Sequence, residues 1–349
     1  MCKSILAFAV LGACASMASA QNSNVTIYGT VDGGLRYQTN TNAAGDSLVS
    51  QTSGHYLANR LGFKGVEDLG GGLKALFTLE SGFAVDTGAQ DVAGTLFNRT
   101  AAVGLGGSAG TVMVGRNYTV AYWTVVAYDP FSYRFPTLAP LISGAGTSQP
   151  AAAVAAGLGS SATSGTRYSN DVQYTGTFGG LTARAEYSAG EQSGSTRAGS
   201  ARAVGMNYVQ GEFAAGAAYT VKYTTLQFRN TARTFGGAWN HDKLRLTAGY
   251  VREIQDAAAR GYGNRLVWAG VGYKLTPELS ATAAYYRSDS LSAGLSGRRE
   301  LAIIGASYAL SKRTLIYGGV DKNRYEGALI PATKMTSQFG AASGIQTSF

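Results

Sequence analysis

Four charged side chains lie at spacings that would let them act together on a charged solute. Arg60 and Lys64 are four residues apart in one segment of alternating polarity, and Lys74 and Glu80 are six apart in the next. Residues separated by an even number of positions point to the same side of a strand. Charges on one side of a low-dielectric wall concentrate field lines and sort solutes by charge. The chemistry indicated is electrostatic selection, with a basic wall and Glu80 as an acidic candidate.

Further charges lie around the longest connection of the chain, residues 119–165. Arg167 follows this connection, and Arg99 precedes it, although the alternation of its own segment would turn Arg99 outward unless a bulge or a rim intervenes. Asp129 is the only Asp or Glu within the connection, where it is accompanied by Arg134. One acid opposite several arginines predicts a net positive site. The alternative is that these charges pair or lie in water and set no selectivity.

Catalytic arrangements are poorly supported. The only histidines, His55 and His241, lie at opposite ends of the expected architecture, so they predict no paired catalytic or metal site. Both cysteines, Cys2 and Cys14, lie in the first twenty residues. The glycine-rich residues 104–110 lack the strand and helix context of a phosphate loop. We expect no enzyme activity, no metal and no cofactor.

The first twenty residues form a secretory signal peptide. Lys3 precedes an apolar run from Ile5 to Leu11, and Ala18-Ser19-Ala20 is a small-residue cleavage site. Leu11-Gly12-Ala13-Cys14 leaves a lipoprotein as the alternative. Removing residues 1–20 takes the formal charge from +9 to +8, because Lys3 is the only charged residue there. Because an exported chain rarely meets nucleic acid, its basic charge indicates an anionic solute or a lipid surface as partner, and we expect no nucleic-acid partner.

The sequence pattern of residues 21–349, the expected mature chain, predicts β-strands. The full chain has 48 glycines and 6 prolines, and no apolar run after residue 20 approaches the ~20 residues of a membrane helix. Turn signals centred near residues 71, 108, 179, 211, 241, 277 and 311 recur at steps of 30 to 37, except for one step of 71. Each ordinary step fits a hairpin of two strands of ~10 residues, the length of a tilted membrane strand.

Between these turns, polar and apolar residues alternate, and aromatic residues collect beside the turns. Alternation would also suit a soluble sandwich, with one face on a core and the other in water. Rings gathered at strand ends instead form a girdle at a membrane interface. The aromatic residues in question are Phe178, Phe213, Trp239, Tyr273 and Tyr308.

Seven hairpins and two terminal strands, near Val25–Gln38 and Gln338–Phe349, predict an all-β, 16-stranded antiparallel transmembrane β-barrel. The terminal strands must pair, because an open edge in lipid leaves backbone groups unsatisfied. Strands near Thr111–Tyr118 and Arg167–Phe178 flank the long connection. We read residues 119–165, including the alanine-rich stretch from 150 to 158, as one loop that folds into the lumen. An additional hairpin, giving eighteen strands, is the alternative.

The chain resembles the trimeric general porins of Gram-negative outer membranes, in their β-proteobacterial (neisserial and burkholderial) form. The similar segments cover the mature chain in family order and are Val25–Gly34, Arg60–Ala75, Leu79–Phe83, Leu96–Arg99, Val114–Tyr118 and Tyr308–Thr314. The end departs from the family: Gly344–Phe349 keeps the terminal aromatic residue but lacks the usual basic residues.

This resemblance implies a barrel with short periplasmic turns, long extracellular loops and a third loop that narrows the pore. It implies a homotrimer in the cell outer membrane, surrounded by lipid and lipopolysaccharide, with Phe349 as the signal read by the barrel-assembly machinery. Arg60, Arg99 and Arg167 match positions where anion-preferring members place a basic ladder. We therefore expect a general diffusion porin for small hydrophilic solutes and ions, with anion preference. The alternative is a plugged barrel that serves as an adhesin or structural anchor.

Overall fold

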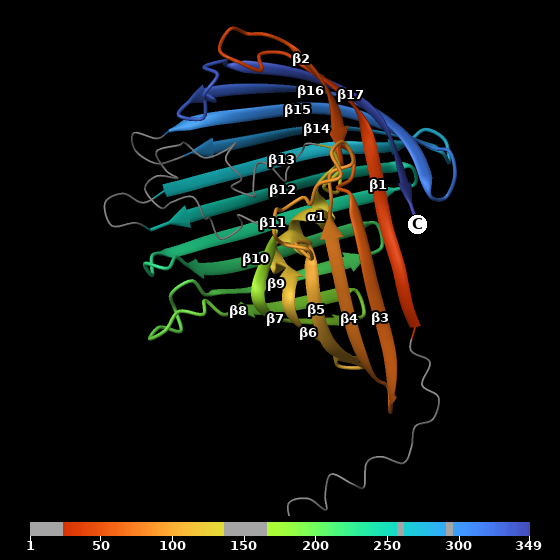
Figure 1. The fold of residues 1–349 in the computed structure, drawn as a ribbon, viewed down its shortest axis with the longest axis vertical. Coiled ribbons are helices and arrows are strands. Elements are labelled where there is room, and N and C mark those ends of the chain that lie inside the picture. Colours follow the sequence, from red (N-terminus) through yellow and green to blue (C-terminus); the bar gives the residue numbers. More distant parts are fainter. Residues whose placement is uncertain (1–23, 136–165, 257–261, 291–295) are drawn as a thin grey trace, which may run out of the picture.

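The computed structural model describes residues 24–135, 166–256, 262–290 and 296–349. The predicted signal peptide and the greater part of the long connection, residues 136–165, lie outside the described residues. The described chain consists almost entirely of antiparallel strands that follow one another around a single curved sheet (Figure 1).

Seventeen strands and one helix make up the described structure. Their bounds are β1 Asn24–Gln38, β2 Leu48–Ser53, β3 Arg60–Gly70, β4 Leu73–Gly82, β5 Thr100–Gly107, β6 Gly110–Tyr118, α1 Val120–Tyr128, β7 Arg167–Phe178, β8 Leu181–Ser188, β9 Ala201–Gln210, β10 Phe213–Tyr223, β11 Arg229–His241, β12 Leu244–Gln255, β13 Tyr262–Lys274, β14 Leu279–Ser290, β15 Gly297–Ala309, β16 Thr314–Gly327 and β17 Ser337–Ser348.

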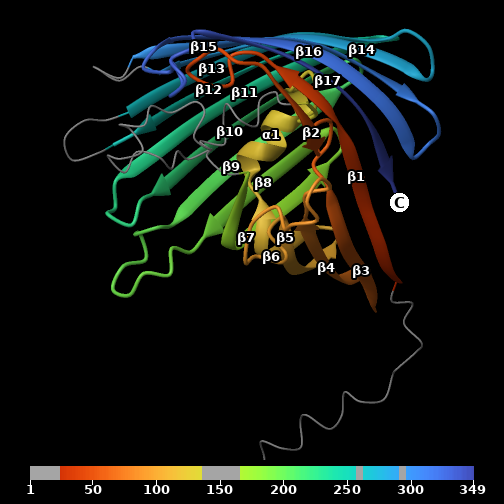
Figure 2. The same cartoon turned by 45° about the horizontal axis from the view of Figure 1, so that its top comes forward.

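The seventeen strands form a sixteen-stranded wall. One end of β1 pairs with β2 and the other end pairs with β3, so β2 and β3 are two parts of one interrupted strand. The terminal strands β1 and β17 pair over nine residues and close the barrel, and they lie side by side in Figures 1 and 2. The sixteen-stranded barrel is confirmed, and the sandwich and the eighteen-stranded barrel are wrong.

All seven predicted turns join neighbouring strands. The turn between β3 and β4 is built from Gly70, Gly71 and Gly72, each with positive φ, at 83°, 60° and 82°. Glycine adopts this left-handed region without steric cost, so the three glycines reverse the chain within a few residues. Such turns keep the strands at one end of the barrel closely connected.

The two faces of the wall differ as the alternation predicts. Large apolar side chains such as Val25, Ile27 and Val103 are about 60 % exposed on the outer face, which suits lipid. Phe178, Phe213, Tyr273 and Tyr308, predicted to form a girdle, are also exposed beside the short turns. No helix in the described part of the chain is long and apolar enough to cross a membrane.

The start of the long connection forms helix α1, where the sequence indicated only loop. The helix lies inside the ring of strands, against β8 to β12 (Figure 2). Thr119 caps its first turn by accepting a hydrogen bond from the Tyr122 amide at 3.1 Å. The helix carries apolar residues on all of its faces, so its sequence shows no amphipathic period. A helix of this kind is stable when it is buried.

Side chains of the wall bind both ends of α1. Glu186 on β8 accepts a hydrogen bond from the Val120 amide at 3.0 Å. At the other end, Arg245 donates to the carbonyl of Ala127 at 2.6 Å, and the Trp268 indole donates to that of Tyr128 at 2.9 Å. An acid at the N-terminus and a cation at the C-terminus match the helix dipole. The helix is therefore fixed to the lumen wall.

Candidate pore constriction

Residues 119–135, the described start of the long connection, are called the inward-folded segment. A cavity of about 470 Å³ lies between this segment and the inner wall of the barrel. Arg60 contributes from the start of β3, Arg99 from just before β5, and Arg167 from the start of β7. Tyr118, Tyr122 and Tyr133 line the same cavity. The structure thus brings together three of the five basic residues predicted for the wall.

Glu80 holds two of these arginines. Its carboxylate accepts a hydrogen bond from Nε of Arg99 at 2.7 Å, and Nη1 of Arg60 lies 4.0 Å away. Arg99 therefore faces the lumen: it precedes the strand, so the alternation of β5 does not determine its direction. Arg99 and Glu80 are both buried, whereas about a fifth of the Arg60 side chain is exposed. Arg60 is the arginine of this pair that a solute can reach.

Tyr28 reaches the same carboxylate across an intervening strand. Its hydroxyl donates to Glu80 at 3.0 Å. Gly62 lies between them in register, opposite Tyr28 on one side and Glu80 on the other. A Cβ at Gly62 would overlap the Tyr28 ring, so only glycine leaves room for this contact. The bare position Gly62 thus allows the tyrosine to orient the carboxylate.

Tyr118 forms a platform for the other two guanidinium groups. Arg167 stacks on the Tyr118 ring with Cζ 3.9 Å from the centroid, as expected for residues opposite each other on β6 and β7. Arg99 donates to the Tyr118 hydroxyl at 2.8 Å, and Tyr122 stacks on the ring at 4.2 Å. The tyrosines hold both guanidinium groups without adding negative charge, and Arg99 in addition forms the ion pair with Glu80.

The other two basic residues of the prediction lie outside this cluster. Lys64 is on the inward face of β3, with Nζ 5.4 Å from the Tyr28 ring centroid. Lys74 pairs in register with Asp68 beside the short turn, six residues along β4 from Glu80. That separation is about 20 Å along a strand. The expectation that Lys74 joins the constriction wall is therefore corrected, because inward parity does not fix depth in the barrel.

Asp129 does not face the basic wall, which corrects a second expectation. Its side chain is fully buried, where it accepts hydrogen bonds from the Tyr286 hydroxyl and the Tyr133 amide, both at 2.6 Å. Burial raises the pKa of this carboxyl to about 6. The sequence shows that the acid is present but not which way it points. Asp129 anchors the segment to β14.

The exposed side chain of Arg134 stacks over Tyr56, with Cζ 5.5 Å from the ring centroid. Phe135 follows and packs edge to face on Tyr56 at 5.2 Å, while its amide donates to the Tyr56 carbonyl at 3.0 Å. The segment is thus fixed at this point also. Sequence reasoning missed the tyrosines of the site; Tyr118 ended one of the family-like segments, which is the signal that could have found it.

The terminal residue Phe349 completes the barrel seam. Its amide and carbonyl form two hydrogen bonds of 3.1 Å with the carbonyl and amide of Gly29. A Cβ at Gly29 would overlap the Phe349 ring. Within the described ranges, no cluster of three or more His, Cys, Asp or Glu side chains could hold a metal.

Comparisons with known proteins agree with this geometry. Residues 7–328 match the model of the Gram-negative porin family. Outer membrane porin protein 32 of Delftia acidovorans is 31 % identical, over 92 % of this chain and 89 % of its own. An outer membrane porin protein of Bordetella pertussis is 28 % identical, over 93 % and 95 %.

Among solved structures, an anion-selective porin from Comamonas acidovorans superposes with a TM-score of 0.80 at 25 % identity, covering 94 % of this chain and all of that one. A closed sixteen-stranded barrel with an apolar outer face and a charged lumen agrees with these matches. The chain therefore belongs to the Gram-negative porin family, as a β-barrel porin of the outer membrane.

Proposed function

We propose that this porin lets small hydrophilic solutes diffuse across the outer membrane and favours anions at the constriction. The observation that carries the proposal is the ratio of charges. Arg60, Arg99 and Arg167 line the cavity, and Glu80, which lies behind this lining, is the carboxylate that pairs with two of them in the described residues. Three guanidinium groups and one carboxylate leave two positive charges. The protein then acts as a channel, and it catalyses no reaction.

Electrostatics favours this assignment. A narrow aqueous path between low-dielectric walls concentrates the field of fixed charges. A sphere of the cavity's volume has a radius of about 5 Å, which is shorter than the screening length of ~10 Å at 0.1 M salt. A solute in the cavity therefore experiences all three arginines. The anion-selective porin that this chain resembles supports the same direction of selectivity.

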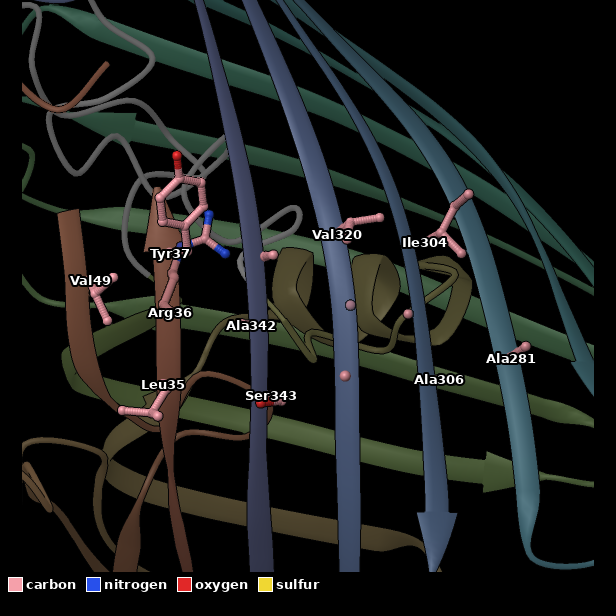
Figure 3. A pocket seen from close by; sticks show the side chains of 14 residues that line it. Leu35, Arg36, Tyr37, Val49, Ala281, Ile304, Ala306, Val320, Ala342 and Ser343 are labelled. Atoms are coloured by element: carbon pink, nitrogen blue, oxygen red, sulfur yellow. The ribbon is translucent and has the colours of Figure 1, made fainter. Parts of the chain in front are cut away.

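We also propose that the protein is a homotrimer embedded among outer-membrane lipid and lipopolysaccharide. A shallow hollow of about 630 Å³ lies on the outer wall, across β1, β2 and β14 to β17 (Figure 3). Small residues such as Ala281, Ala306 and Ala341 line it. Small side chains let two barrels approach closely in lipid, where packing drives association. Phe349 remains our candidate for the signal read by the assembly machinery.

The proposal is tested in a planar bilayer of neutral lipid under a salt gradient. Conductance steps in groups of three that reverse toward the chloride potential are expected. Replacing Arg60 and Arg167 by Gln should lower the anion preference, because the net charge at the cavity falls from two positive charges to none. Lys274→Gln with Lys312→Gln removes the same charge at the short turns and should leave the ion ratio unchanged.

Reversal toward the cation potential in the wild type would refute the anion preference. Equal ion ratios in the Arg60/Arg167 variant and the wild type would refute the role of these residues. Folded barrels that give no steps would support a plugged barrel, acting as an adhesin or anchor, in place of an open channel.

A further inference from the structure

A row of arginines crosses the outer face of three neighbouring strands. Arg233 on β11 lies directly opposite Arg252 on β12, which lies directly opposite Arg265 on β13. We call these three residues the outer arginine row. Like charges directly opposite each other destabilise a sheet, so a bound anion would stabilise such a row.

The row faces outward. Along the strands, Phe235 and Tyr250 lie two residues from Arg233 and Arg252 and therefore share their face. Phe235 is 50 % exposed, whereas the alternate residues Ala232 and Val251 are 1 % exposed on the opposite face. The arginines thus project from the wall beside aromatic side chains of the outer surface.

The protein supplies too few acids for this row. Within the described ranges, neither Arg233 nor Arg252 has a carboxylate at ion-pair distance. Arg265 binds Asp289 at 2.9 Å, but Arg287 and Arg298 bind the same carboxylate, each at 3.0 Å. Arg298 also approaches Glu326 at 3.6 Å. The excess positive charge therefore lies at the β11 and β12 end.

The row also lies at the depth of lipid headgroups. Arg252 is eight residues along β12 from Leu244, which follows the short turn. At ~3.3 Å a residue and a strand tilt of about 40°, this is about 20 Å along the membrane normal. The outward apolar band of such barrels is ~25 Å tall and is flanked by aromatic residues. The guanidinium groups reach its outer edge, at the end of the barrel opposite the short turns.

We propose that the outer arginine row binds the phosphate groups of an anionic lipid in the outer leaflet. Guanidinium groups bind phosphate in a bidentate manner, and three of them in a line suit a lipid that carries more than one phosphate. The row lies on β11 to β13, away from the hollow of small residues assigned to contact between copies. This inference rests on the lipid contact in the proposed function and gives it a site.

The test uses the full protein, refolded in detergent, and diphosphorylated lipid A as the probe. Binding is measured by native mass spectrometry over a range of probe concentrations, with a dephosphorylated form and inorganic phosphate in parallel. Neutralising an arginine near an anionic surface should weaken binding about fivefold. The triple variant R233Q/R252Q/R265Q should therefore lose on the order of a hundredfold.

Matched variants separate charge from folding. K243Q/K274Q/K312Q removes three charges at the short turns and should bind as the wild type does. R233K/R252K/R265K keeps the charges but loses the bidentate contacts, so its affinity should lie between those of the wild type and the Gln variant. If the triple Gln variant does not fold, R252Q alone should show the fivefold loss. The proposal is overturned by wild-type affinity in the Gln variants, by equal loss in the short-turn control, or by equal binding of the dephosphorylated lipid.

Two further outcomes distinguish the source of the anion and the two proposals. Binding of inorganic phosphate in place of lipid A would assign the row to a soluble anion and overturn the lipid site. Ion selectivity in neutral lipid should be unchanged in R233Q/R252Q/R265Q. Loss of lipid binding with intact anion preference supports both proposals, whereas a cation-preferring pore that still binds lipid A overturns only the proposed function.

Discussion

Replacing Glu80 by Gln should increase anion preference. The substitution removes the carboxylate that lies 2.7 Å from Arg99 and 4.0 Å from Arg60, so the net charge at the cavity rises from two to three positive charges. Gln keeps an oxygen that can accept from Arg99 and from Tyr28. The Gly62 gap, through which Tyr28 reaches this position, is unaffected. The change is therefore mainly one of charge.

The size of the effect follows from the cavity. An ion at its centre lies about 5 Å from the wall and about 8 Å from a carboxylate set behind the first layer of atoms. At a dielectric constant of ~80, removing a unit charge at that distance shifts the energy of each ion by about 0.5 kcal/mol before screening. Screening leaves roughly half at 0.1 M salt and about three quarters at 0.01 M. The ratio of anion to cation permeability should rise about twofold and about fourfold, respectively.

The assay is the reversal potential of single channels at the two salt concentrations, with Glu80→Asp as a control that keeps the charge. Heat-dependent mobility of the barrel in gel electrophoresis checks folding, because breaking a buried ion pair costs roughly 3–5 kcal/mol. A permeability ratio that is unchanged or lower in folded E80Q would refute the assignment of the constriction charges. An increase that does not depend on salt would show that pore shape, and not the field, had changed.

Two further predictions concern the inward-folded segment. The pKa of Asp129 is raised to about 6, above its ordinary value of 3.8, so the protonated carboxyl stabilises the folded segment. This stabilisation is complete below pH ~3.8 and is lost as pH rises through 6. Hydrogen exchange of residues 120–135, corrected for intrinsic rates, should therefore be slower at pH 5 than at pH 7.5, and Asp129→Asn should remove the difference. A pH dependence that persists in D129N would contradict this origin. Gly236→Val should displace Tyr128, because a Cβ at Gly236 would overlap that ring, and should destabilise the seat of α1 by about 1–3 kcal/mol; noisier channel current is expected, and Gly237→Val, whose Cβ has only one ordinary contact, at 3.5 Å, is the matched control.

The barrel could be predicted from the sequence because each strand repeats the same physical requirement. Alternation, glycine-rich turns and an even count of strands with paired ends follow from a wall between lipid and water. The interruption between β2 and β3 could not be predicted in this way, because both parts belong to one strand position. Helix α1 was missed because it is apolar on all faces, so its sequence shows no hydrophobic period of 3.6 residues.

The candidate site could be predicted only in part. Arg60 and Arg167 lie at strand starts, so alternation and the end of the long connection identified them. The direction of the Arg99 side chain depends on the residues that precede β5, and that of Asp129 depends on how α1 packs against the wall. Neither direction can be predicted from the alternation of a strand. The contact from Tyr28 to Glu80 requires the register of three strands and the missing side chain at Gly62. The register is set by how neighbouring strands pair, and the sequence of one strand does not determine that pairing.

The structure separates the parts that hold the constriction from the parts that charge it. The inward-folded segment is held by Glu186 and Arg245 at the ends of α1 and by Tyr286 at Asp129. Its one acid is thereby buried and removed from the field that a solute meets. The charges at the cavity belong to the barrel wall, where strand pairing fixes their spacing. We therefore expect the segment to set the width of the cavity and the wall to set the sign of its charge, so that substitutions at one leave the other largely unchanged.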